Sequence, residues 1–207
     1  AWDCATGNGQ VAVALARYVE RVVATDASQA QIDAAVAHPA VSYRVATAEA
    51  SGLDNDTVDL VTVGQALHWF DTARFFAEAS RVLVAGGILA AWCYELCTVS
   101  PACDAIVQRL YTAIVGPFWP KERHLIEERY AGIEFPGAAL APPTFEMTAR
   151  WAADDMLGYL RTWSACQRYL REHGEDPVEL VEKELRRAWG SALRTARWPL
   201  TVRVAQL

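Results

Sequence analysis

Two acidic residues and two glycines near the start of the chain have the types and spacing that suit a nucleotide-like ligand. Asp3 closes a short apolar stretch, and Gly7 and Gly9 lie in the turn that follows it. Glycine has no side chain, so such a turn can bend sharply and a ligand can approach the main chain. Asp26 ends the next apolar run, about 20 residues later, where a carboxylate can accept hydrogen bonds from ribose hydroxyls.

A second stretch with chemical potential follows the fourth apolar run and reads Gln-Ala-Leu-His-Trp-Phe from Gln65 to Phe70. Histidine changes its charge near neutral pH, so His68 is a candidate base or hydrogen-bond donor. The alternative interpretation is that His68 packs structurally. The sequence leaves both interpretations open.

Strands and helices in alternation are needed to bring these residues together. Hydrophobic patterns predict strands that end at Asp3 and Asp26, and further strands at Val41–Val45, Val58–Gly64 and Ile88–Tyr94. Helices are predicted at Gln10–Tyr18, at Ser28–Ala37 with a capping box of Ser28 and Gln31, and at Asp71–Val84 with Gly86-Gly87 as its end. Such alternation predicts a parallel sheet with right-handed crossovers.

The second half of the chain has a different pattern, dominated by helices. The predicted helices cover residues 102–115, 119–130, 153–172 (one or two helices) and 177–192. Strands are predicted at Thr144–Trp151 and Trp198–Gln206, with a proline-containing loop at Gly132–Pro143. No internal repeat or long linker divides the chain.

The segment Asp3–Gly9 resembles the first motif of the class I S-adenosylmethionine-dependent methyltransferases, with Ala5 where that family usually has its first glycine. Ala48-Glu49, after the third strand, and Gln65–Phe70, after the fourth, resemble the later motifs of the family. The likeness is greatest to the small-molecule enzymes grouped with the trans-aconitate methyltransferases. It spans the whole chain and is strongest up to Tyr94.

The resemblance implies an α/β, Rossmann-like fold with helices on both faces of a mostly parallel sheet. Seven strands in the order 3-2-1-4-5-7-6 are expected, with the last strand antiparallel. One methyltransferase domain is expected over residues 1–207, with a helical substrate cover at about 96–143 and 153–192. Because the chain lacks a start methionine and the first predicted strand begins in its middle, residues are expected to precede Ala1 in the natural chain.

The resemblance also assigns site residues, with S-adenosyl-L-methionine as the cofactor and no metal. The candidates for cofactor binding are Asp3, Ala5, Gly7, Gly9, Asp26, Ala27, Ala48, Glu49 and Gln65. His68 is the candidate catalytic residue, and the substrate candidates are Trp69, Tyr94, Tyr159 and Trp163. Methyl transfer depends mainly on in-line positioning in a dry pocket, so no catalytic triad is required. The expected acceptor is a small molecule, with a carboxylic acid as one option.

Two alternatives compete with this interpretation. Gly7-x-Gly9-x-x-Ala12 also fits a dinucleotide-binding pattern, which favours a nicotinamide-dependent dehydrogenase. Asp3 argues against it, because a carboxylate before the glycines would repel a pyrophosphate. The other alternative is a non-catalytic domain that binds S-adenosylmethionine.

Composition narrows the partners and the compartment. The chain has 207 residues, 53% of them hydrophobic, with eight Trp, which suits a substantial core. A net charge of −6 disfavours nucleic acid, and no apolar run approaches the ~20 residues that a membrane span needs. Five Cys without a CxxC spacing predict reduced thiols in a cytoplasmic protein. The oligomeric state stays open.

Overall fold

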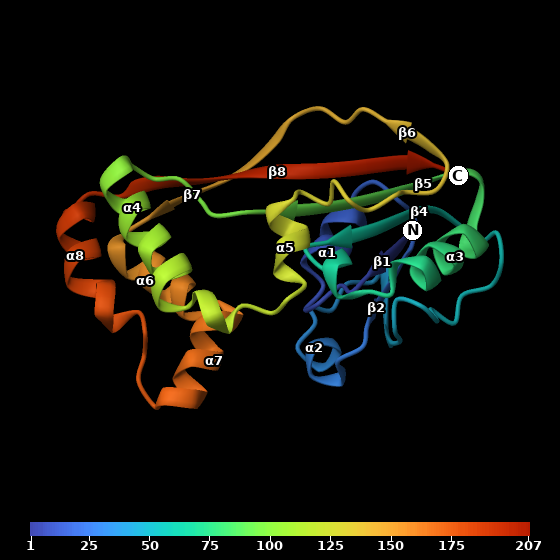
Figure 1. Ribbon diagram of the computed structural model, residues 1–207. Helices are drawn as coiled ribbons and strands as arrows, with labels where there is room; N and C mark the ends of the chain where they lie inside the picture. The colour runs from blue at the N-terminus through green and yellow to red at the C-terminus, as the bar shows by residue number, and fades with distance from the viewer. The chain divides into compact units, whose positions relative to one another are not determined.

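Up to Tyr94 the chain alternates strands and helices, and most of the strands lie where the hydrophobic pattern predicts them (Figure 1). The computed structural model describes residues 1–207. The strands of this part are β1 (Trp2–Cys4), β2 (Val22–Asp26), β3 (Val41–Val45), β4 (Val58–Gly64) and β5 (Leu83–Tyr94). The helices are α1 (Gln10–Leu15), α2 (Gln29–Asp33), the 3₁₀ turn η1 (Leu67–Trp69) and α3 (Thr72–Val82).

The second half supplies more helices and the remaining strands. The helical segments are α4 (Pro101–Arg109), the π-helical η2 (Leu110–Ile114), the 3₁₀ turn η3 (Gly116–Phe118), α5 (Arg123–Glu127), α6 (Ala153–Arg161), α7 (Ser164–His173) and α8 (Glu179–Trp189). The strands are β6 (Ala138–Leu140), β7 (Phe145–Trp151) and β8 (Arg194–Gln206). No helix combines the length and the apolar character that crossing a membrane requires.

The sheet has the order β3-β2-β1-β4-β5-β8-β6, and β7 also pairs with β8. Strands β1 to β5 pair in parallel, whereas β8 pairs antiparallel with β6. The predicted order is therefore confirmed, with the last strand inserted next to β5. The number of strands is eight rather than seven, because the predicted sixth strand is preceded by a separate short strand, β6, inside the predicted loop.

Packing divides the chain into two compact units, each made of segments that are distant in sequence. The first unit contains residues Ala1–Tyr94, Leu125–Phe145 and Thr201–Leu207, and the second contains Glu95–His124 and Glu146–Leu200. The segment 96–143, predicted to belong to a helical cover, is thus shared between the two units.

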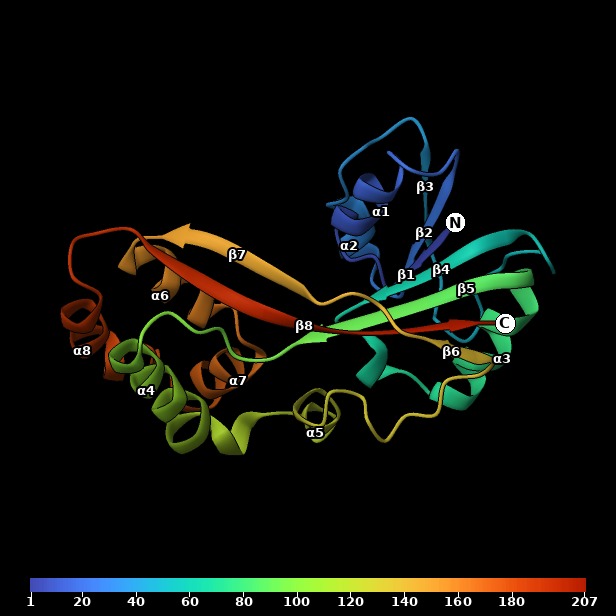
Figure 2. The same cartoon turned by 90° about the horizontal axis from the view of Figure 1, so that it is seen from above.

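The sheet of the first unit buries side chains on both faces. Ala12 of α1 packs with Val22 and Ala24 of β2 in one cluster. A larger cluster on the other face includes Phe75 of α3 and Ile126 of α5. Figure 2 shows α1 and α2 on one side of strands β1 to β5 and α3 on the other side. Helices cover both faces of the sheet, as predicted. A ligand can therefore approach this sheet at the ends of its strands.

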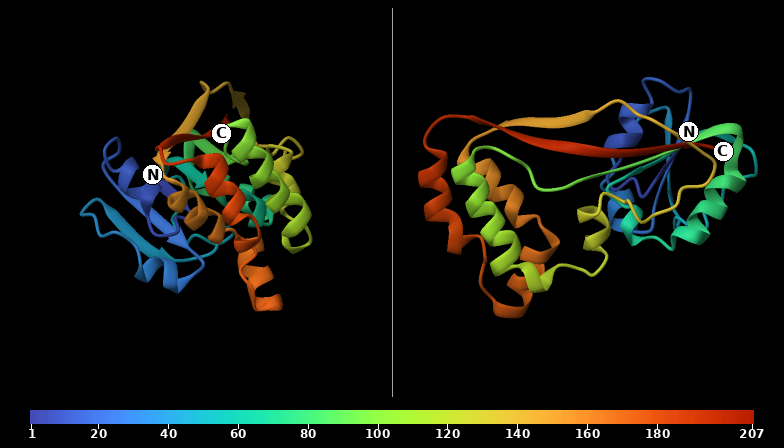
Figure 3. Two further views of the ribbon diagram at one scale, coloured as in Figure 1. Left: turned by 90° about the vertical axis from the view of Figure 1, so that its left-hand side faces the viewer. Right: turned by 45° about the horizontal axis from the view of Figure 1, so that its top comes forward.

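The second unit is built mainly from helices (Figure 3). In α8 the residues Val181, Leu185 and Trp189 recur every four positions and are all fully buried. This spacing places them on one helical face, which accounts for the packing of α8 against α4 and α6.

Several predicted boundaries are wrong for local reasons. Gly86-Gly87 does not end a helix: α3 ends at Val82, and the two glycines lie inside β5. The capping box of Ser28 and Gln31 does not form, because the Ser28 side chain makes no capping bond. The Ser28 N–H instead donates to Asp26 Oδ1 over 2.9 Å. The helices expected at 10–18 and 119–130 are shorter, as α1 and α5.

Candidate functional site

Asp3 lies behind the glycine loop, where it connects the loop to the sheet. Its carboxylate accepts hydrogen bonds from Thr6 Oγ1 at 2.5 Å and from Thr62 Oγ1 of β4 at 2.7 Å. The side chain is 1% exposed, and this burial raises its pKa to about 6, against the opposing effect of the bonds from Thr6, Thr62 and the Ala12 N–H. Asp3 therefore holds β1, the loop and the start of α1 together.

The loop has three residues in the left-handed region of backbone space. Ala5, Gly7 and Gly9 have φ angles of 54°, 58° and 88°. A side chain at Gly9 would place its Cβ against the Tyr43 ring and hydroxyl group, and φ is positive, so this position favours glycine. Ala5 adopts a glycine-like conformation although it carries a methyl group, which strains the backbone.

Asp26 stands at the carboxyl end of β2 and is bonded only to main-chain donors. Its Oδ2 accepts from the Gly7 N–H and its Oδ1 from the Ser28 N–H, both at 2.9 Å. A carboxylate has about four acceptor positions, so two remain for a ligand. These bonds fix the carboxylate against the loop while leaving it able to accept two hydroxyl groups.

A cavity of about 400 Å³ opens at the carboxyl ends of β1 to β4. Its lining residues are Ala5, Asp26, Ala27, Ala46, Thr47, Ala48, Glu49, Gly64, Gln65, Ala66, Trp69 and Phe70. Seven of the predicted site residues are among them: Ala5, Asp26, Ala27, Ala48, Glu49, Gln65 and Trp69. Asp3, Gly7 and Gly9 do not line the cavity but shape the loop beside it.

Gln65 follows β4 and takes a left-handed conformation, with φ of 54°. Its side-chain amide pairs with the main chain of Tyr94: Oε1 accepts from the Tyr94 N–H at 2.8 Å, and Nε2 donates to the Tyr94 carbonyl at 3.2 Å. The predicted substrate residue Tyr94 is thereby held next to the cavity wall. Sequence reasoning missed this pairing, since nothing in the order of residues distinguishes it from an exposed glutamine.

Glu49 and Trp69 lie at the rim of the cavity. Glu49 Oε1 accepts from the Asp71 N–H over 3.1 Å, which ties the loop after β3 to the start of α3. The Trp69 side chain is 53% exposed, which is high for so large an apolar group. An exposed aromatic ring beside a cavity is suited to covering an apolar ligand group.

His68 is buried in the first unit and bonded to a residue that sequence reasoning did not select. Its Nδ1 lies 3.2 Å from the Tyr130 hydroxyl oxygen, and its ring centroid lies 4.7 Å from that of Trp69. Tyr130 is fully buried, and Arg203 of β8 donates to its carbonyl oxygen over 2.6 Å. The His68 imidazole is thus held by Tyr130, and Tyr130 is held in turn by Arg203 from the last strand of the chain.

The remaining substrate candidates, Tyr159 and Trp163, belong to the second unit. Their ring centroids are 6.0 Å apart, and Trp163 also packs against Tyr111 and Trp119 at 5.8 and 5.6 Å. The structure therefore brings these two candidates together within an aromatic cluster of their own unit.

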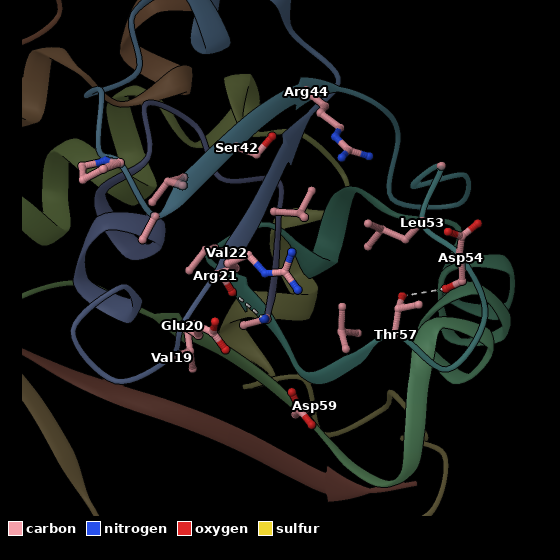
Figure 4. Close-up of a pocket in the computed structure, with 17 residues that line it drawn as sticks. Val19, Glu20, Arg21, Val22, Ser42, Arg44, Leu53, Asp54, Thr57 and Asp59 are labelled. Atoms are coloured by element: carbon pink, nitrogen blue, oxygen red, sulfur yellow. Dashed lines mark hydrogen bonds between the residues drawn. The ribbon is translucent and has the colours of Figure 1, made fainter.

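A second cavity, of about 480 Å³, lies at the opposite edge of the same sheet (Figure 4). It is lined by residues where strands begin, such as Val22, Val41 and Val58. Ligands of open α/β sheets bind beyond the carboxyl ends of the strands, so the position of this larger cavity disfavours it as a cofactor site.

The residues around the 400 Å³ cavity fit S-adenosylmethionine. The cavity lies within the usual range of about 300–1,000 Å³ for small-ligand pockets. Small side chains at Ala27, Ala46 and Ala48 leave room for a flat base, and Asp26 offers acceptors for the two hydroxyls of a ribose. A pyrophosphate would instead meet the Asp26 carboxylate, which lines the cavity, with the buried carboxylate of Asp3 behind the loop.

Comparisons with known proteins agree with this fit. A family model described as a methyltransferase domain matches residues 2–91. A Dictyostelium discoideum protein whose name places it among the methyltransferases is 32% identical over 198 residues, which cover 90% of this chain and 72% of the relative. The predicted closeness to the trans-aconitate methyltransferases is not addressed by these matches and stays a prediction.

Solved structures give the same assignment. A structure from Anaeromyxobacter dehalogenans, described as a type II methyltransferase, is 42% identical with a TM-score of 0.91, over 99% of this chain and 88% of that chain. A Bacillus halodurans structure shares the fold at 22% identity and a TM-score of 0.55, over 99% of this chain and 90% of that one. On this evidence, the chain belongs to the class I S-adenosylmethionine-dependent methyltransferases.

Proposed function

We propose that this methyltransferase transfers the methyl group of S-adenosylmethionine to a small-molecule acceptor, and that its two units act as one methyltransferase domain. The observation that supports the proposal most is the cavity at the carboxyl edge of β1 to β4, with the Asp26 carboxylate in its wall. Carboxylic acids are the first acceptor class to test.

The proposed binding roles follow from the donors and acceptors around the cavity. Asp26 accepts the hydroxyl protons of the ribose, and the Ala48 amide contacts the base. The Gln65 carbonyl accepts from the ammonium group of the methionine part, while its side chain stays paired with Tyr94. Asp3 acts indirectly by holding the loop that Ala5, Gly7 and Gly9 form.

When bound, S-adenosylmethionine supplies an electrophilic methyl group on a sulfonium, which is already a good leaving group. The chain's own residues then contribute position and exclusion of water rather than covalent chemistry. Trp69 and Phe70 at the rim are the residues proposed to keep water from the reacting atoms.

The role proposed for His68 depends on the acceptor. A hydroxyl or amine acceptor must lose a proton, and His68, oriented by Tyr130, is the candidate base. A carboxylate acceptor is already deprotonated and needs no base. Replacing His68 by Gln should therefore lower the rate with a hydroxyl acceptor and leave the rate with a carboxylate acceptor nearly unchanged.

The cofactor part is tested by the thermal midpoint of unfolding with S-adenosylhomocysteine, with NAD as the parallel ligand. A ligand at 100 times its dissociation constant should stabilise the fold by about 2.7 kcal/mol. Asp26→Ala should abolish the shift, whereas Asp33→Ala, an exposed carboxylate on α2, should keep it. A shift with NAD alone, or an undiminished shift in Asp26→Ala, would contradict the proposed site.

The acceptor part is tested by the formation of S-adenosylhomocysteine from S-adenosylmethionine. A panel of small carboxylic acids is compared with neutral alcohols and with amines of similar size. Turnover of at least one panel member supports a small-molecule acceptor. Turnover only with a protein or nucleic-acid fraction would overturn it.

A further inference from the structure

The second unit contains an arginine whose surroundings differ from those of every other partly buried arginine. Five arginines are neither fully buried nor fully exposed: Arg81, Arg123, Arg161, Arg194 and Arg203. Four of them donate from their guanidinium groups to carboxylates or main-chain carbonyl oxygens. Arg123 donates to neither.

Arg123 is held by aromatic residues instead. Its Nε donates to the Tyr111 hydroxyl over 2.9 Å, and its guanidinium carbon lies 4.7 Å from the Trp119 ring centroid and 5.4 Å from that of Tyr111. Trp119 is fixed in turn, because its Nε1 donates to the Tyr111 carbonyl over 3.1 Å. The protein hydrogen bond of Arg123 comes from Nε, so the two terminal NH₂ groups of this partly exposed side chain are left to donate to a ligand.

The aromatic contacts do not supply hydrogen-bond acceptors for the terminal NH₂ groups of Arg123. A cation is attracted to the face of a ring, but a ring face accepts no hydrogen bond of ordinary strength. A guanidinium presents its N–H groups in a planar fork that matches a carboxylate with two parallel hydrogen bonds. The Arg123 side chain is thus already ordered before a carboxylate binds. Binding therefore loses less side-chain entropy than it would with a mobile arginine.

The neighbouring side chains indicate what the carboxylate would be attached to. Trp163 is nearly buried and lies 5.6 Å from Trp119, ring centroid to centroid. Its ring stands edge-on to Tyr111 at 5.8 Å. Rings gathered beside one unpaired cation suit a ligand with an apolar or aromatic body and one acid group.

We propose that Arg123, with Tyr111, Trp119 and Trp163, forms a binding site for a carboxylate carried on an aromatic or apolar body. That this ligand is the methyl acceptor rests on the proposed function. The existence of the site does not, because its residues all lie in the second unit and its contacts require no cofactor.

The test uses the full chain and the probe phenylacetate, with phenylacetamide as its neutral counterpart, followed by tryptophan fluorescence and calorimetry. Phenylacetate should bind at least about tenfold more tightly than phenylacetamide, since only the acid can make the paired bonds. Arg123→Gln should remove this difference, and Arg123→Lys should restore part of it. Arg171→Gln, an exposed arginine on α7, should leave it unchanged.

Equal binding of acid and amide, or equal losses in Arg123→Gln and Arg171→Gln, would overturn the site. An intact thermal shift with S-adenosylhomocysteine in Arg123→Gln shows that the variant is folded. Carboxylate binding through Arg123 without any methyl transfer would leave the site standing and count against the proposed function. Methyl transfer that is unchanged in Arg123→Gln would show that the ligand of this site is not the methyl acceptor, and it would leave the proposed function standing.

Discussion

The two units place polar groups in different ways. Every buried Asp, Glu, His, Ser and Thr of the chain lies in the first unit, namely Asp3, Thr6, Thr25, Ser51, Thr62, His68 and Glu78. The buried residues of the second unit are apolar, aromatic or cysteine, and its Arg161 pairs with two carboxylates that are partly exposed. The first unit thus buries carboxylates and an imidazole, whereas the ionisable groups buried in the second unit are the thiols of three cysteines and the phenol of Tyr111.

The candidate sites differ in the same way. The cavity of the first unit is lined mainly by small residues, with Trp69 and Phe70 at its rim, and its carboxylate is fixed by main-chain N–H groups. The aromatic cluster of the second unit is formed by large side chains around one guanidinium. We therefore expect the stability of the first unit to fall most when a substitution adds atoms to the loop beside its cavity. The stability of the second unit should fall when a substitution removes atoms from its aromatic cluster.

The largest effect is expected when a methyl group is added to the loop of the first unit. Gly9→Ala should lower the free energy of unfolding by about 3 kcal/mol, because the new Cβ meets the Tyr43 ring and φ is positive. Gly174→Ala in the second unit has a similar φ of 74° and nothing within 4 Å of the new Cβ, so it should cost only about 1 kcal/mol. Urea denaturation of both variants measures the difference, and equal losses would break the comparison.

The next effect is the pH dependence expected from the buried carboxylates of the first unit. The Arg81 side chain, with help from Ser51, lowers the pKa of Glu78 to about 2. Its stabilisation of about 2–3 kcal/mol is therefore present above pH 4.5 and lost as the pH falls toward 2. Glu78→Gln should lose that amount at pH 7 and much less at pH 2.5.

Asp3 should show the opposite dependence, because burial raises its pKa to about 6. An ionised Asp3 costs about 3 kcal/mol at pH 7, and this cost disappears as the pH falls from 6 to 3.8. Asp3→Asn should therefore gain stability relative to the unchanged protein between pH 4 and pH 7 in urea titrations. A difference that does not vary with pH would show that Asp3 does not titrate as its burial predicts.

A smaller effect is expected from removing atoms in the second unit. Trp119→Phe loses the bond from Nε1 to the Tyr111 carbonyl and part of the contact with Arg123. The free energy of unfolding should fall by about 1 kcal/mol. The midpoint shift with S-adenosylhomocysteine should stay the same. A reduced shift would mean that the two sites are coupled.

The smallest effect is a gain in stability. Ala5 has a positive φ of 54°, which costs an alanine about 1–2 kcal/mol. Ala5→Gly removes this strain but adds freedom to the unfolded chain, so a net gain of about 0.5 kcal/mol is expected. The urea midpoint measures it, and a loss of stability would show that the methyl group makes a contact worth more than the strain.

The sequence predicts the first unit better than the second for a physical reason. Strands β1 to β5 and their turns follow from local hydrophobic patterns. The glycines of the short motif after β1 indicate where the loop needs a left-handed backbone conformation. The residue Tyr130 could not be found this way, because its importance comes from a contact with His68 across 62 positions. Strand β6 is exposed at all three residues and carries no alternating pattern.

The second unit shows the limit most clearly at Arg123. Its type and position suit an exposed helix face, and only the ring contacts distinguish it from Arg171 or Arg187. Of the single helix predicted for residues 119–130, only α5 forms, over Arg123–Glu127. Tertiary packing decided these elements, and no local pattern encodes it.

The insertion of β8 beside β5 also affects the order in which the protein can assemble. Gly86 of β5 bonds to Leu207, and Gln206 reaches the Gly86 carbonyl across 120 positions. During synthesis, β5 therefore presents an unpaired edge until residues 201–207 have emerged from the ribosome. Contacts between such distant positions form slowly, and an open strand edge invites association with other chains. The first unit, which contains the proposed cofactor site, is thus expected to be completed last.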